Sequence, residues 1–132
     1  MAATLTVRDE TTSPLDRDHV FLLDLPSGRV TVEELIRARV HREVEDFNAS
    51  RPGHFRGLVQ PSGAERTLNG FRVREGRKID SEEQCGKAME AFGRNGFILL
   101  VDDRQAEELD EEIEVCPETT VTFLKLVPLV GG

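Results

Sequence analysis

The residues at the end of the chain are the ones best suited to take part in chemistry. Residues 120–132 read TVTFLKLVPLVGG, in which a strand-like alternation runs into Pro128 and ends at Gly131 and Gly132. Because glycine is about 7% of residues, a diglycine at one position arises by chance in roughly one chain in two hundred. A carboxylate on such an end is a handle that a separate enzyme can activate with ATP, so the chain is expected to be a substrate and not a catalyst.

Each residue type near the end suits delivery of a carboxylate into a narrow channel. Gly131 and Gly132 have no Cβ, so they allow close backbone approach and φ values that other residues avoid. Pro128 has no N–H, so it ends the hydrogen-bond ladder of the strand and stiffens the exit from the sheet. The apolar anchors expected in the partner's channel are Leu129, Val130 and, unless it points into the core, Leu126.

Composition and charge exclude several classes of partner. A net charge of −8 argues against nucleic acid and against an anionic membrane surface. The chain has seven Phe and no Trp or Tyr, so it has no platform for stacking bases. No apolar run approaches the ~18 residues of a membrane span, and the first ten residues lack a signal-peptide pattern. Cys85 and Cys116 do not form a disulfide framework and are expected to be inert, partly buried thiols, which favours a cytoplasmic protein.

Motifs for catalysis or for cofactor binding are missing from the sequence. His19, His41 and His54 are scattered over a strand, a helix and a loop, without a nucleophile pattern around them. The chain has neither a phosphate-binding G-x-x-x-x-G-K-[ST] loop nor the spacing of a calcium loop. We therefore expect no catalytic residue, no metal ligand and no cofactor in this chain, with ATP used only by the partner enzyme.

The first half of the chain predicts two strands and a helix. Residues 4–10 alternate as a half-buried strand, and residues 19–25 are apolar enough for a central strand paired antiparallel to the first. Thr31 and Glu34 form a capping box that starts a helix running to about residue 48. Its apolar stripe is Val32, Leu35, Ile36, Val40, Val44 and Phe47, and its solvated face is Arg37, Arg39, Arg42, Glu45 and Asp46.

Residues 49–80 are rich in glycine, proline and arginine and predict an irregular insertion. Two short strands can flank the turn at residues 61–63. The basic residues can form a binding surface, but a solvated loop is the preferred interpretation.

The last third predicts a helix, two strands and an acidic connection. Ser81 and Gln84 form a second capping box, and the helix should end in a left-handed turn at Gly93 or Gly96. Residues 97–101 form a short buried strand. Residues 102–118 hold nine acidic residues and one basic residue, and solvation is preferred over a docking surface for a basic partner. The last strand should begin at Val121 and close at Pro128.

This order of elements predicts an α+β fold in which a mixed sheet packs on a helix. The last strand can lie between earlier strands and parallel to one of them. We expect a single domain over residues 1–127, with residues 49–80 as an insertion between the two helices. Residues 128–132 are expected to form a flexible tail.

The chain resembles the β-grasp, ubiquitin-like superfamily. The resemblance is carried by TVEEL at residues 31–35, by ILLVDDRQA at residues 98–106, and most specifically by the ending from residue 118 to residue 132. That ending is similar to those of the sulfur carriers of thiamine and molybdopterin synthesis. It is also similar to those of bacterial ubiquitin-like proteins encoded beside activating and conjugating enzymes. Residues 49–80 have no counterpart in the minimal fold.

The resemblance implies a modifier whose carboxylate at Gly132 is adenylated by a ubiquitin-activating-like enzyme and passed through a thioester to a target protein. It allows a conjugating enzyme and a deconjugating peptidase as further partners, and it links bacterial relatives to antiphage defence. Two alternatives stay open: a sulfur carrier that forms a thiocarboxylate, and a β-grasp interaction domain that is never conjugated. The insertion favours the modifier, because sulfur carriers are usually near the minimal fold.

Overall fold

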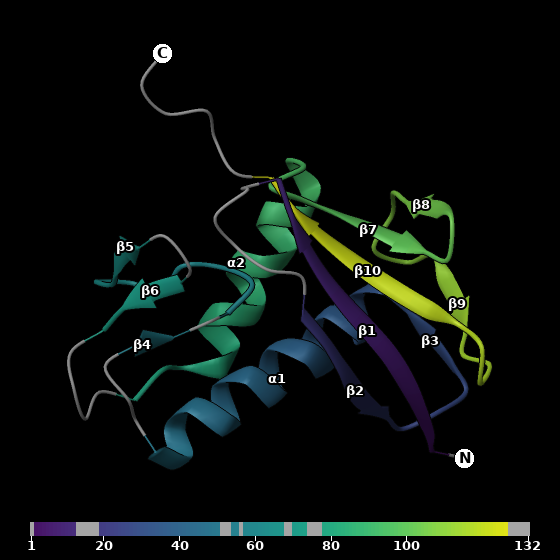
Figure 1. Ribbon diagram of the computed structural model, residues 1–132, viewed down its shortest axis with the longest axis horizontal. Coiled ribbons are helices and arrows are strands. Elements are labelled where there is room, and N and C mark those ends of the chain that lie inside the picture. The colour runs from purple at the N-terminus through teal and green to yellow at the C-terminus, as the bar shows by residue number, and fades with distance from the viewer. Residues whose placement is uncertain are drawn as a thin grey trace.

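Five strands form a mixed sheet that is covered on one face by a helix (Figure 1). The computed structural model describes residues 2–12, 19–50, 54–55, 57–67, 70–73 and 78–126. The strands are, in spatial order, β2 (His19–Leu25), β1 (Ala3–Thr11), β10 (Thr120–Lys125), β7 (Phe97–Val101) and β8 (Arg104–Ala106). β1 and β10 run parallel, and the other neighbours are antiparallel. The expected mixed α+β sheet, with the last strand inserted beside the first, is confirmed.

Two helices separate this sheet from a smaller one in the insertion. These are α1 (Val32–Ser50) and α2 (Ser81–Gly93). The smaller sheet has the order β4 (His54–Phe55), β6 (Gly70–Arg72) and β5 (Glu65–Thr67), and Figure 1 shows it on the other side of α2 from the large sheet. A third pairing joins β3 (Arg29–Thr31) to β9 (Glu112–Glu114). Neither helix in the described ranges is long and apolar enough to cross a membrane.

β2 lies at the edge of the five-stranded sheet, so the expectation of a central strand was wrong. Its antiparallel pairing with β1 is confirmed. The other side of β1 is taken by β10, which leaves β2 outermost. Its alternation is that of a half-buried strand: Leu23 and Leu25 face the core, while Val20 and Leu22 are 57% and 58% exposed on the outer face.

α1 begins at the predicted capping box. The Glu34 N–H donates to Thr31 Oγ1 over 3.1 Å, and the Thr31 N–H donates to Glu34 Oε1 over 3.0 Å. These bonds satisfy backbone donors that have no partner within the first turn of a helix. The predicted apolar stripe is buried: Val32, Leu35, Ile36, Val40, Val44 and Phe47.

Arg39 does not lie on a solvated face of α1, as its charge had suggested. Its side chain is only 2% exposed, because it follows Leu35 by one helical turn and lies under the sheet. Its Nη2 donates to Asp9 Oδ2 over 2.7 Å, and its Nε donates to Glu43 Oε1 over 2.6 Å. Asp9 continues the inward alternation of β1, so a carboxylate from the sheet meets a guanidinium from the helix inside the protein.

Two aromatic rings complete the surroundings of Arg39. The Arg39 guanidinium carbon lies 4.4 Å from the ring centroid of Phe123 on β10 and 5.5 Å from that of Phe21 on β2. Burial opposes the charge, but the carboxylates of Glu43 and Asp9 outweigh it and raise the pKa of Arg39. The side chain therefore stays cationic while it connects α1 to three strands.

The insertion is attached to both helices by specific hydrogen bonds. Asn48 Nδ2 donates to the Ile79 carbonyl, and the Ile79 N–H donates to Asn48 Oδ1, each over 2.9 Å. Glu43 Oε2 accepts from the Leu58 N–H over 3.2 Å, and Gln84 Nε2 donates to the Val59 carbonyl over 3.1 Å. The described part of residues 49–80 thus contains three short strands packed on α1 and α2.

The turn expected at residues 61–63 is present within the insertion. The Ala64 N–H donates to the Pro61 carbonyl over 3.2 Å, and Gly63 has a φ of 74°. A positive φ at this third position of the turn favours glycine.

The ends of α2 differ from the predicted ones. Asp80, and not Ser81, is the N-cap, since its carboxylate accepts from the N–H groups of Glu82 and Glu83. The Gln84 side chain donates to the Val59 carbonyl in the insertion and does not complete the predicted capping box. The helix ends at Gly93 as expected, but the left-handed residue is Asn95, with a φ of 60°. Asparagine tolerates this conformation better than most residues do.

The acidic connection contains two short strands that the sequence did not predict, β8 and β9. Ile113 is buried, and the acidic side chains around it are exposed. Arg29 on β3 pairs with Glu114 over 2.8 Å. Arg104 donates to the carboxylate of Glu111, and this hydrogen bond lowers the pKa of Glu111.

Replacing Arg39 by Met should lower the free energy of unfolding by about 3–5 kcal/mol, because two neighbouring carboxylates lose their only buried cation. Urea denaturation measures this change. Arg37→Met is the matched control, since Arg37 is 42% exposed and pairs only at the surface. That control should cost less than about 1 kcal/mol. Equal effects of the two variants would contradict the buried role of Arg39.

Replacing Arg104 by Gln should raise the pKa of Glu111 toward its ordinary value of 4.5. A carboxyl whose folded pKa is depressed stabilises the protein above its unfolded pKa and loses that contribution as the pH falls through the folded pKa. The variant should therefore lose a small acid-dependent part of its stability. Carboxyl NMR titration measures the shift, and an unchanged pKa of Glu111 would contradict the assigned cause.

Candidate functional site

The predicted conjugation segment begins where β10 leaves the sheet. β10 is flanked by β1 and β7, and its last residue, Lys125, is in register with Thr11 on one side and Phe97 on the other. Leu126 follows directly and is 37% exposed. The chain therefore reaches the surface by Leu126, and the alternative in which this side chain points into the core is wrong.

Five residues of the predicted segment lie outside the residues that the structure describes. They are Pro128, Leu129, Val130, Gly131 and Gly132. Their roles as stiffener, apolar anchors and site of activation stay predictions from sequence.

The outer face of the sheet carries both apolar and charged side chains near the end of β10. Register places Leu124 on this face between Glu10 and Ile98, and both apolar side chains are partly buried. Exposed Val20 and Leu22 lie on the same face, across β1.

One cluster outside that segment has the composition of a serine–lysine catalytic pair. Lys87 Nζ donates to Ser62 Oγ over 2.8 Å and lies 3.6 Å from the Glu83 carboxylate. Ser62 in turn donates to Glu83, and this bond lowers the pKa of Glu83. The cluster lies at the surface, where Ser62 and Glu83 are exposed. The cluster is better suited to holding the 61–63 turn on α2.

The two cysteines are in different environments. Cys85 is fully buried on α2, and burial raises the pKa of its thiol. Cys116 is exposed, so the expectation that it is partly buried was wrong. Both are free thiols. A buried neutral thiol is a poor nucleophile, which leaves Cys116 as the reactive one.

The histidines of the described region do not form a catalytic group. His41 is 44% exposed on α1 and lies 3.5 Å from Glu82, while His19 packs against Phe21 at the start of β2. Among the described residues, no group of three or more His, Cys, Asp or Glu side chains is placed to hold a metal ion.

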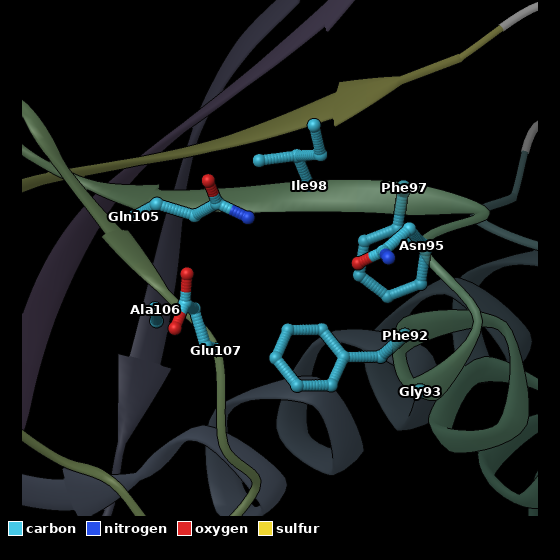
Figure 2. Close-up of a pocket in the computed structure, with 8 residues that line it drawn as sticks. All are labelled: Phe92, Gly93, Asn95, Phe97, Ile98, Gln105, Ala106 and Glu107. Atoms are coloured by element: carbon cyan, nitrogen blue, oxygen red, sulfur yellow. The ribbon is translucent and has the colours of Figure 1, made fainter.

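A hollow of about 300 Å³ lies between the end of α2 and strands β7 and β8 (Figure 2). We call it the α2–β7 hollow. Phe92 and Phe97 form one wall, and Asn95, Gln105 and Glu107 bring polar groups to it. The sequence interpretation missed this site, because it assigned Phe92 to the core and Glu107 to a solvated acidic run.

Comparisons with protein-family models, with curated proteins and with solved structures returned no match to this chain.

Cys116 should react with an aromatic disulfide reagent in the native protein, whereas Cys85 should react only in denaturant. The reason is the burial of Cys85 and its raised pKa. Absorbance of the released thiolate counts the reactive thiols. A Cys116→Ser variant should lose the native-state reaction, and persistence of that reaction would show that Cys85 is accessible.

Proposed function

We propose that this chain is a ubiquitin-like protein modifier whose C-terminal carboxylate, at Gly132, is adenylated by a separate activating enzyme. The observation that carries the proposal is the position of the predicted segment. It follows a central strand of the sheet directly, and its first residue, Leu126, is already exposed. A segment that leaves the sheet in this way can enter a partner's channel while the domain stays folded.

The strand order supports a β-grasp fold. In such a fold the first two strands form a hairpin, a helix crosses the sheet, and the last strand returns beside the first and parallel to it. The order β2-β1-β10-β7-β8, the parallel β1–β10 pair and α1 across the inner face agree with that arrangement. The insertion between α1 and α2 is an addition to it.

The proposed chemistry is acyl activation in three steps. An oxygen of the Gly132 carboxylate attacks the α-phosphorus of ATP, and pyrophosphate leaves. A cysteine thiolate of a partner then attacks the acyl carbon of the adenylate, and AMP leaves with the bridging oxygen. An amine of the target finally displaces the thiolate and forms an amide. Glycine suits all three steps, because it has no side chain to block the acyl carbon.

In this scheme the described domain supplies no catalytic group. It presents the segment after Lys125 at the end of the outer face, which carries Leu124, Ile98, Val20 and Leu22. Apolar side chains on an exposed face are suited to contact with a partner. The proposal therefore assigns recognition of the domain to the outer face, and delivery of the carboxylate to the segment after Lys125.

Incubating the protein with ATP and hydroxylamine in an extract of its source cells should convert the Gly132 carboxylate to a hydroxamate. Hydroxylamine attacks an acyl-adenylate or a thioester, but it leaves a free carboxylate unchanged. Intact mass of the recovered protein gives the product, and the same mass confirms that Gly132 is its last residue.

A variant lacking Gly131 and Gly132 should give no hydroxamate and should keep the unfolding free energy of the full chain. Leu126→Ser should keep the fold and weaken activation, because Leu126 is outside the core. A product in which sulfur replaces one carboxyl oxygen would identify a sulfur carrier instead. An extract that activates a control modifier but leaves this protein unchanged would refute the proposal.

A further inference from the structure

We propose that Glu43 couples the docking of the insertion to the ion pair between α1 and the sheet, so that the two contacts form and break together. Both contacts lie within the folded domain, so the coupling does not depend on the proposed activation of Gly132. It follows from how one buried carboxylate shares its two oxygens, and from the lack of space beside Gly57.

The Glu43 carboxylate lies between the buried guanidinium and the insertion. Its Oε1 accepts from Arg39 Nε over 2.6 Å, and its Oε2 accepts from the Leu58 N–H over 3.2 Å. The Glu43 side chain is only 13% exposed, so little water can replace either donor. Arg39 in turn donates to Asp9 on β1. One chain of hydrogen bonds therefore runs from the sheet through α1 to the insertion.

The guanidinium and the insertion compete for one carboxylate. Without the charge of Asp9, Arg39 would draw both Glu43 oxygens into a two-point contact, because a guanidinium fork fits a carboxylate in that way. Oε2 would then leave the Leu58 N–H. The effect runs in the opposite direction as well, since coupling between two sites is reciprocal. If the insertion undocks, the freed oxygen turns toward Arg39 and draws the guanidinium away from β1.

The apolar contacts of the insertion lie next to this hydrogen bond. Phe55 and Leu58 are 2% and 7% exposed, and the Phe55 ring meets the Phe47 ring of α1 edge to face, with centroids 5.3 Å apart. A Cβ at Gly57 would lie 2.1 Å from a carbon of the Phe55 ring and 3.1 Å from Glu43 Oε2. A methyl group at Gly57 would therefore disturb the docked insertion and the carboxylate together, without touching β1.

The test is a double-mutant cycle of Asp9→Asn and Gly57→Ala in the full chain, measured by urea denaturation. Each single change should raise the unfolding constant. In the double variant the constant should be roughly three- to tenfold smaller than the product of the two single effects predicts, because residues of one network couple by such amounts. Independent sites would give the product itself, and that result would overturn the proposal.

Two matched cycles exclude a general effect of either change. Gly86→Ala adds the same methyl group to α2, where no neighbouring atom of the described structure lies within 4 Å of it. Asp24→Asn removes the same charge from an exposed residue of β2. The cycles of Asp9→Asn with Gly86→Ala, and of Asp24→Asn with Gly57→Ala, should be additive. Coupling of the same size in either control would refute a path through Glu43.

NMR of the single variants decides the question if the double variant does not fold. In Asp9→Asn the Leu58 amide proton should move upfield, because it loses a charged acceptor. The Ala64 amide, which is bonded within its own turn, should stay in place. In Gly57→Ala the carboxyl carbon signal of Asp9 should shift, whereas in Gly86→Ala it should not. A Leu58 amide or an Asp9 carboxyl that keeps its wild-type shift would overturn the coupling.

Discussion

The contact between Arg39 and the carboxylates of Asp9 and Glu43 fixes how the helix sits on the sheet. A guanidinium out of water is costly unless its charge and its donors are satisfied, and a small displacement of α1 would separate Arg39 from Asp9 on β1, while Glu43 would move with the helix. The Arg39 side chain also packs against Phe123 on β10 and Phe21 on β2. An apolar contact would tolerate sliding, but this one specifies the register of α1 against three strands.

That constraint also decides which surfaces remain available. With α1 held on the inner face, Val20, Leu22 and Leu124 remain on the outer face, and β10 ends beside them. The α2–β7 hollow also lies near the end of β10, because Phe97 is in register with Lys125. The outer face carries charged as well as apolar side chains, since Leu124 is in register with Glu10 and Val20 with Arg8.

Sequence predicted the elements whose signals are local. The capping box of Thr31 and Glu34 requires only four residues, and it appears as expected. β3 and β9 were missed because three-residue strands have too little periodicity, and their pairing joins segments about 80 residues apart. The cap of α2 was misassigned because the bond from Gln84 to Val59 depends on the docked insertion.

Arg39 and the α2–β7 hollow show a different limit of prediction from sequence. Arg39 follows Leu35 and precedes Glu43 at helical spacing, and Asp9 follows Leu5 and Val7 at strand spacing, so the signal for a buried ion pair was present. It was overridden by the general rule that charged residues face water. The hollow had no such signal, because its walls come from two segments that only the β7–β8 pairing brings together. The role of the diglycine segment is predicted from the sequence alone. The structure adds the exposed position of Leu126.

The proposed activation at Gly132 makes a direct prediction about the fate of one oxygen atom. The measurement is mass spectrometry of the nucleotide product after activation of protein whose Gly132 carboxylate carries ¹⁸O. Adenylation joins a carboxylate oxygen to the α-phosphorus, so the released AMP should carry ¹⁸O. Label found in inorganic phosphate, or AMP without label while the protein is modified, would contradict the proposal.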